Sequence, residues 1–173
     1  MPFGAASDPD TALRRAIEIF QKTGVQAAKL EGGRHMAATV ERLTTQGVAV
    51  MGHIGLVPQS VHQLGGYYRH GRGELEAQEL VDAAKSLQDA GAFSIVLEAI
   101  VPEVAARITD ELTIPTIGIG SGDACSGQVL VINDLIGLNL HPAPSFAKPK
   151  ADISSVITAA VTSYIAEVKD SHD

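Results

Sequence analysis

The chain has 173 residues, of which 45% belong to the apolar set, and it contains a single cysteine. This length and composition suffice for one domain with a buried core, and they exclude a linker or a disulfide-stabilised scaffold. Thirteen Lys and Arg residues against 20 Asp and Glu residues give a net charge of -7, which disfavours a nucleic-acid partner. No apolar run approaches the roughly 20 residues that span a bilayer. Cys125 has no partner for an internal disulfide and the first residues do not resemble a secretory signal, so we expect a cytoplasmic protein with no membrane partner.

The order of the predicted elements is that of an α/β protein. Aromatic residues make up only 4% of the chain and Trp is absent, so aliphatic residues must fill the core, as in parallel sheets covered by helices. Strands are predicted to start near residues 26, 48, 94 and 115. Amphipathic helices are predicted at residues 8–23, 35–46, 74–90, 102–112 and 153–169, whereas residues 129–132 fit a strand and a helix equally well.

The spacing of the strands indicates repeated βα units. The first and last intervals between strand starts are nearly equal, and the middle interval is about twice as long because a Gly-, Tyr- and His-rich segment, residues 57–73, follows the second strand. This segment shows no clear period and is longer than the usual βα connection, which is typical of a lid or a substrate-facing loop. The whole pattern predicts a (β/α) barrel or an open parallel sheet.

Polar residues at the ends of the predicted strands are the candidates for chemistry, because the strands of a parallel sheet all end on one face. Glu31 follows the first strand, His53 the second and Glu98 the third. Glu98 ends an apolar run, so its carboxylate must be paired, protonated or metal-bound, and we favour a functional role for it. Lys29 shares a strand face with Glu31, and this pattern alone slightly favours a structural ion pair. His53 is equally compatible with a structural and a functional role.

The glycines of IGIGSG, residues 117–122, give only a weak indication of a nucleotide site. A complete dinucleotide-binding motif would need its third glycine where Asp123 or Cys125 stands. Two carboxylates and a lysine at the end of a parallel sheet suit chemistry on a 2-oxo acid instead. One carboxylate can hold a divalent cation, the lysine can balance the charge of the acid, and the second carboxylate can accept a proton.

Six segments, in order along the chain, resemble the ketopantoate hydroxymethyltransferase family. They are AKLEGG at 28–33, GHIGLVPQSV at 52–61, GGYYRHGR at 65–72, VLEAIVPEVAARIT at 96–109, IPTIGIGSG at 114–122 and FAK at 146–148. The resemblance implies a (β/α)8 TIM barrel of the phosphoenolpyruvate/pyruvate type, Mg²⁺ as cofactor and a large homo-oligomer. It also implies transfer of a hydroxymethyl group from 5,10-methylenetetrahydrofolate to 3-methyl-2-oxobutanoate, which gives 2-dehydropantoate in the first committed step of pantothenate biosynthesis.

The matching segments also imply roles for individual residues. Glu98 in VLEA matches the proton acceptor of the family. Lys29 in AKLEGG matches the lysine that contacts the keto acid, and Glu31 matches the glutamate on the magnesium side. His53 lies in a family motif from which we carry over no specific role.

The start of the sequence departs from the family pattern. Family members have a strand that ends in an acidic residue followed by Leu-Pro-Phe, whereas this sequence opens with Met1, Pro2 and Phe3. The Asp-Ser motif of the family, which binds metal and substrate, would lie further upstream, and a complete barrel takes about 250 residues. We therefore expect residues 1–173 to form a single, partial barrel domain, from about the fourth strand to the C-terminal helix, that is inactive alone. Ser121 in the glycine loop and Ala99 after the base are smaller departures.

Two alternatives stay open. The first is a truncated, non-enzymatic remnant or a partner subunit, which the flanking DNA would distinguish from an intact enzyme by the absence of an upstream Asp-Ser strand. The second is another keto-acid lyase or mutase of the same barrel superfamily, and the GHIGLVPQSV segment argues against it.

Overall fold

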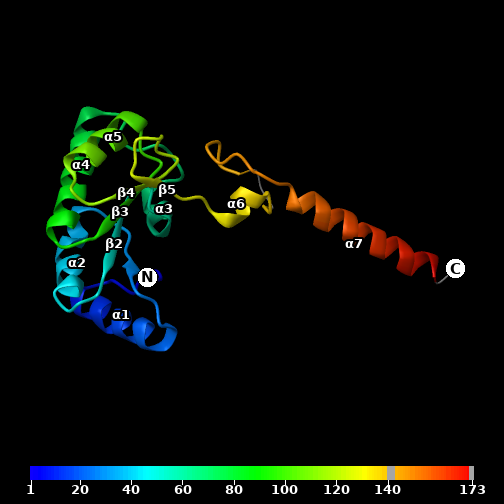
Figure 1. Cartoon of the computed structure of the whole chain (residues 1–173), viewed down its shortest axis with the longest axis horizontal. Coiled ribbons are helices and arrows are strands. Elements are labelled where there is room, and N and C mark those ends of the chain that lie inside the picture. Colours follow the sequence, from blue (N-terminus) through cyan, green and yellow to red (C-terminus); the bar gives the residue numbers. More distant parts are fainter. Residues whose placement is uncertain (140–142, 172–173) are drawn as a thin grey trace. The chain divides into compact units, whose positions relative to one another are not determined.

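The computed structural model of the chain describes residues 1–139 and 143–171 and divides into two compact units. The first unit is Met1–Val129 and the second is Leu130–Asp173 (Figure 1). All candidate site residues lie in the first unit. Among the helices of the described residues, none combines the length and the apolar character that crossing a membrane requires.

The first unit is built on a parallel sheet of five strands in the order β1-β2-β3-β4-β5. The strands are β1 (Ala28–Lys29), β2 (Val50–Gly55), β3 (Ser94–Glu98), β4 (Thr116–Ile119) and β5 (Gly127–Gln128). The predicted α/β class and parallel sheet are thereby confirmed. Within the described ranges β1 and β5 have one neighbour each, so the sheet is open and is consistent with part of a (β/α) barrel.

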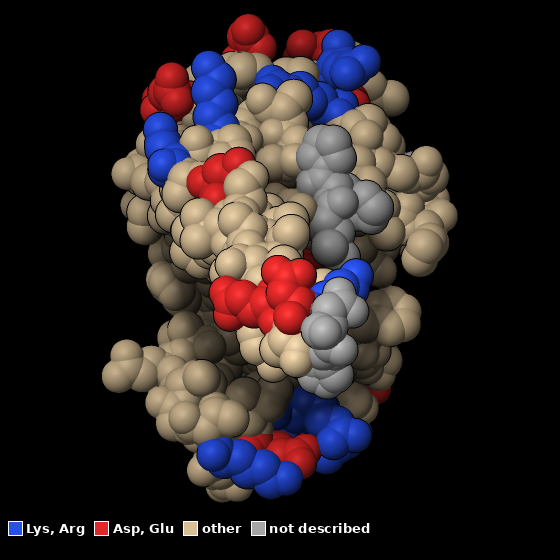
Figure 2. Space-filling view, turned by 90° about the vertical axis from the view of Figure 1, so that its right-hand side faces the viewer, with Lys and Arg blue, Asp and Glu red and all other residues tan. Residues whose placement is uncertain are grey.

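Helices alternate with the strands, as βα units require. They are α1 (Pro9–Thr23), α2 (Ala37–Thr44) with a 3₁₀ turn before it (Arg34–Met36), α4 (Glu74–Asp89) and α5 (Pro102–Glu111). Asp8 caps α1 by accepting a hydrogen bond from the Thr11 amide at 2.9 Å, and Gly24 ends the helix with a φ of 69°. These are the ends that the sequence predicts for this helix. On its surface Glu18 pairs with Arg15 and Lys22. Figure 2 shows acidic and basic side chains next to one another at the lower end of the view.

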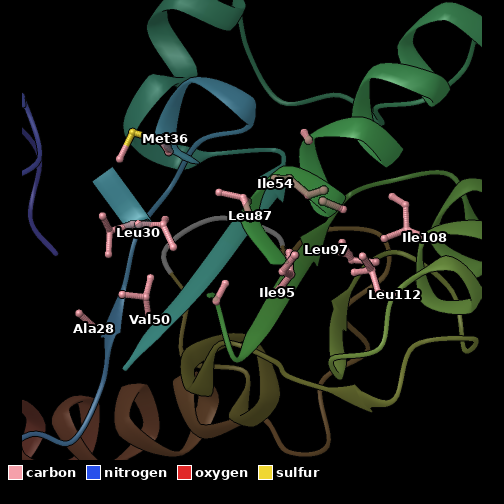
Figure 3. Close-up of a cluster of buried hydrophobic side chains, with 14 of the residues drawn as sticks. Ala28, Leu30, Met36, Val50, Ile54, Leu87, Ile95, Leu97, Ile108 and Leu112 are labelled. Atoms are coloured by element: carbon pink, nitrogen blue, oxygen red, sulfur yellow. The ribbon is translucent and has the colours of Figure 1, made fainter. Parts of the chain in front are cut away.

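The core of the first unit lies between the sheet and these helices. Ile95 and Leu97 of β3 are fully buried, and Leu87 of α4 and Ile108 of α5 pack on the same side of the sheet (Figure 3). The same cluster contains Ala28 of β1, Leu30 directly after β1, and Val50 and Ile54 of β2. Alternate residues of a strand point to opposite faces. The residues between these core positions therefore point to the face of the sheet that lies away from the helices.

Two segments differ from the elements expected from the sequence. The Gly-, Tyr- and His-rich segment is not wholly irregular, because it contains a 3₁₀ turn (Pro58–Ser60) and the short helix α3 (Val61–Leu64). Residues 129–131 are neither strand nor helix, since β5 ends before them and α6 (Ile132–Ile136) begins after them. Pairing with a neighbouring strand decides where β5 forms, and a two-residue strand leaves no periodic pattern in the sequence.

The second unit contains α6 and the long helix α7 (Ile153–Asp170). Asp152 caps α7 by accepting hydrogen bonds from the amide and the hydroxyl of Ser155. The helix agrees with the one predicted for residues 153–169. None of its residues is buried, so the apolar stripe that predicted the helix lies exposed on its surface.

Candidate functional site

Four polar side chains extend from the ends of adjacent strands on the face of the sheet away from the helices. Lys29 is the last residue of β1 and Glu31 lies two residues further on. His53 lies in β2 and Glu98 is the last residue of β3. In the parallel register His53 stands opposite the residue two positions before Glu98, so the side chains of neighbouring strands reach the same region.

His53 lies at the centre of these side chains, and only 1% of its side chain is exposed. The Lys29 Nζ atom is 3.3 Å from His53 Nδ1, and Glu31 Oε1 is 4.0 Å from the same nitrogen. Glu98 Oε2 is 3.0 Å from His53 Nε2. The structure thus brings all three predicted site residues together around the histidine whose role the sequence leaves undecided. We call Lys29, Glu31, His53 and Glu98 the polar cluster.

The contacts of His53 indicate which ring nitrogen carries the proton. The Lys29 ammonium has only protons to donate, so a hydrogen bond to Nδ1 requires a lone pair there and places the imidazole proton on Nε2. Nε2 is close to Glu98, but the carboxylate oxygen lies off the direction of a hydrogen bond. The two atoms are close, but hydrogen bonds lose strength steeply off axis, so the contact is weak as a hydrogen bond. Glu98 is therefore not fully engaged by His53.

The charges of the polar cluster partly balance one another. Glu31 and Glu98 are largely shielded from solvent, with 11% and 17% of their side chains exposed. Shielded carboxylates need nearby donors or cations. Glu31 accepts a hydrogen bond from the Gln59 amide at 2.9 Å and lies on the Lys29 side of His53, whereas Glu98 lies on the other side. The arrangement places a cation at one end of the cluster and a carboxylate at the other, which suits a small substrate that carries both a carboxylate and an acidic C–H bond.

Gly55 allows β2 to approach the backbone of Glu98. Its φ is 89°, a conformation that side chains rarely adopt, and a Cβ atom there would overlap the carbonyl oxygen of Glu98. The next residue, Leu56, donates its amide to that carbonyl oxygen at 2.8 Å. Gly55 of the GHIGL motif is therefore explained by its close packing against the backbone of Glu98.

The polar cluster supplies few ligands for a metal ion. In residues 1–139 and 143–171 there is no group of three or more His, Cys, Asp or Glu side chains that could hold one. Mg²⁺ prefers six oxygen ligands, and proteins often supply only one or two carboxylates while water and substrate supply the rest. Glu31 is a suitable ligand in kind, since it is a carboxylate at the edge of the cluster. Carboxylate oxygens are the kind of ligand that Mg²⁺ prefers, but the polar cluster provides fewer of them than the ion needs.

Two further residues of the site are not assigned by the sequence. His53 follows the same sequence logic as Glu98, because both are polar residues in otherwise apolar strands, and its burial could have been inferred from that pattern. Gln59 contributes a backbone amide that the 3₁₀ turn directs at Glu31. No side-chain pattern reports a contact of this kind.

Comparison with known proteins identifies the family. A model described as ketopantoate hydroxymethyltransferase matches residues 1–172. The 3-methyl-2-oxobutanoate hydroxymethyltransferases of Paracoccus denitrificans and Syntrophus aciditrophicus are both 49% identical to this chain, over 98% and 93% of it and over 62% and 59% of their own lengths. That of Geobacter metallireducens is 48% identical over 98% of this chain and 64% of its own length. The chain thus spans less than two thirds of the length of these curated relatives. It belongs to the ketopantoate hydroxymethyltransferase family.

Proposed function

We propose that this chain provides the proton-accepting and keto-acid-binding residues for transfer of a hydroxymethyl group from 5,10-methylenetetrahydrofolate to 3-methyl-2-oxobutanoate. The product would be 2-dehydropantoate, the first intermediate of pantothenate biosynthesis. The observation that carries the proposal is the meeting of Lys29, Glu31 and Glu98 around one buried histidine at the ends of adjacent parallel strands. The names of the relatives support the same reaction.

The geometry of the polar cluster supports different roles for Lys29 and Glu98 toward the keto acid. The Lys29 ammonium would hold the carboxylate of 3-methyl-2-oxobutanoate as a point charge. Glu98 would accept the proton from C3, and the electron pair of that C–H bond would form the enolate. C3 would then bond to the transferred one-carbon unit, water would supply its hydroxyl oxygen, and tetrahydrofolate would leave. His53 lies 3.0 Å from Glu98 without a well-directed hydrogen bond to it, so we assign His53 no step in the reaction.

We propose further that Glu31 provides one carboxylate ligand of Mg²⁺. When bound, the cation polarises the 2-oxo group and makes the C3 proton more acidic. The other ligands would come from water, from the substrate and from the portion of the relatives that this chain does not span. Glu31 also accepts a hydrogen bond from the backbone amide of Gln59, which would fix the orientation of the carboxylate.

We propose a cytoplasmic homo-oligomer as the working form. The single cysteine suits a reducing compartment. The homo-oligomer is what the resemblance to the family implies.

The proposed function can be tested by extending this chain to the full length of its relatives. A chimera would join residues 1–173 to the portion of the Paracoccus denitrificans protein that lies outside its match, and the intact Paracoccus protein would be the positive control. We expect the chimera to form 2-dehydropantoate from 3-methyl-2-oxobutanoate and 5,10-methylenetetrahydrofolate, measured by mass spectrometry. A folded chimera that binds the keto acid and forms no product would contradict the proposal.

Glu31 and Lys29 should affect different kinetic parameters of that chimera. Glu31→Gln removes a charged magnesium ligand, so the magnesium concentration at half-maximal rate should rise about tenfold or more. Lys29→Met is the matched variant, since it removes the neighbouring charge: the KM for the keto acid should rise while the magnesium dependence stays as it was. Titrating magnesium and keto acid separately against initial rate checks both. An unchanged magnesium dependence in Glu31→Gln would show that Glu31 is not a ligand.

A further inference from the structure

The residue after Glu98 has an unusual backbone conformation. Ala99 has a φ of 50° and is the only non-glycine residue with a positive φ in the described parts of the chain. An L-residue in this region costs roughly 1–2 kcal/mol, so the surrounding structure must hold it there. Ala99 is also buried, which leaves little room for another arrangement. The turn changes the direction of the main chain directly after the predicted base.

Ser121 holds the two sides of this turn. It is fully buried in the glycine loop after β4, and its Oγ atom donates a hydrogen bond to the Leu97 carbonyl at 2.7 Å. The same Oγ accepts a hydrogen bond from the Ile100 amide at 3.0 Å. One hydroxyl therefore joins the residue before Glu98 to the residue after Ala99.

The Ser121 hydroxyl pairs with the backbone at the point where the pairing between β3 and β4 ends. The Ala99 amide still donates to the Ile119 carbonyl of β4 at 2.9 Å, as expected for a continuing ladder. The Ala99 carbonyl, however, turns to the His70 amide at 2.8 Å. Successive amides of a strand alternate sides, so the Ile100 amide of a continuing strand would face β2, whereas after the turn at Ala99 it is paired by the Ser121 side chain. The side chain of Ser121 thus completes the backbone pairing on the β4 side of the turn.

We propose that Ser121 is a positioning residue for Glu98. Its hydroxyl fixes the main chain on both sides of Glu98 and Ala99, and this directs the Glu98 carboxylate toward the buried His53. The importance of the contact for catalysis rests on the proposed function of Glu98, whereas its effect on the direction of the carboxylate does not.

A pair of serine variants separates positioning from stability. Ser121→Ala removes the hydroxyl beside Glu98. Ser94→Ala is the matched control, because Ser94 is 2% exposed, donates to the Pro115 carbonyl at 2.9 Å and lies at the opposite end of the same strand. Ser121→Ala takes a partner from two buried backbone groups and Ser94→Ala from one, so we expect the temperature of unfolding to fall in both and to fall further in Ser121→Ala.

The two variants should differ at the end of β3. In Ser121→Ala the exchange rate of the Ile100 amide should rise about tenfold, as for the loss of one buried hydrogen bond. The rate at which a carbodiimide and an amine label the Glu98 carboxylate should rise severalfold, because the side chain turns away from His53 into solvent. Both rates should stay within twofold of the parent chain in Ser94→Ala. Mass spectrometry of the peptide that covers β3 and Ile100 measures both the amide exchange and the labelling of Glu98, and neither measurement requires catalytic activity.

Three results would overturn the proposal. One is faster Ile100 exchange in Ser121→Ala with unchanged labelling of Glu98, since the hydroxyl would then have a structural role only. Another is an equal rise in labelling in both serine variants, which would indicate general loosening. If Ser121→Ala does not fold, the double variant Ala99→Gly/Ser121→Ala removes the conformational cost at Ala99. Labelling of Glu98 at the parent rate in that folded variant would also refute the proposal.

Discussion

Replacing Glu98 by Gln should abolish exchange of the C3 proton of 3-methyl-2-oxobutanoate with solvent deuterium in the chimera. A positioned general base contributes roughly 10²- to 10⁴-fold to such a step, and the amide of Gln has nearly the same shape but accepts no proton at this site. Lys29 and His53 stay in place, so keto-acid binding should change little. Loss of the C3 proton signal in an NMR time course measures the exchange, and calorimetry measures the binding.

The control for this result is a second Glu→Gln substitution in a paired carboxylate outside the polar cluster. Glu111 of α5 binds Lys85 and Arg107, and hydrogen bonds from these two side chains hold the pKa of the Glu111 carboxyl below its usual range. Glu111→Gln therefore removes one fully ionised carboxylate and should leave C3 exchange within twofold of the parent rate. Undiminished exchange in Glu98→Gln would mean that another group accepts the proton.

The sequence predicts Glu98 for a local reason. A carboxylate that ends the apolar run of Ile95, Val96 and Leu97 must be compensated, and this follows from three neighbouring residues alone. The common face of Lys29 and Glu31 follows from the alternation of an extended chain, although β1 itself ends at Lys29. Their roles in catalysis stay predictions until the variants are measured.

The meeting point of these residues could not be predicted in the same way. His53 becomes their centre because β1 pairs with β2 so that Lys29 stands opposite Met51, and β2 pairs with β3 so that Gly55 stands opposite Glu98. A slip of one residue in either register would turn a strand's side chains to the other face. Registers between strands far apart in the sequence depend on the packing of the whole sheet, and no local pattern encodes them.

The Ser121 contact depends on a still less local feature. The hydroxyl meets the Leu97 carbonyl and the Ile100 amide only because Ala99 leaves the normal strand conformation, and an alanine in the sequence does not predict a positive φ. The sequence shows Ser121 as a departure in a glycine loop, and the structure supplies the turn that this side chain completes. Departures from a family pattern are therefore informative once the backbone around them is known.

Residues 1–173 on their own should not turn over 3-methyl-2-oxobutanoate. The described residues contain no group of three potential metal-binding side chains, and a single carboxylate such as Glu31 holds Mg²⁺ weakly because the ion gives up its water reluctantly. Their sheet has five strands and two edges, whereas the proposed barrel has eight strands and no edge. We expect the edge of β1, which has a neighbouring strand on one side only in the described residues, to promote association of the purified chain.

Magnesium-dependent product formation and size in solution, measured on the same preparation and beside the chimera, check this expectation. A monodisperse monomer with the activity of the chimera would contradict it, and acidic side chains such as Asp8 or Asp10 would then have to replace the absent ligands. Mixing the chain with the Paracoccus portion as a separate polypeptide distinguishes the remaining cases. Turnover only in the mixture would identify a partner subunit, because two polypeptides would then complete one metal site and one sheet. Turnover only in the covalent chimera would show that Glu98 and Lys29 need a continuous chain to be held in register with the rest of the barrel.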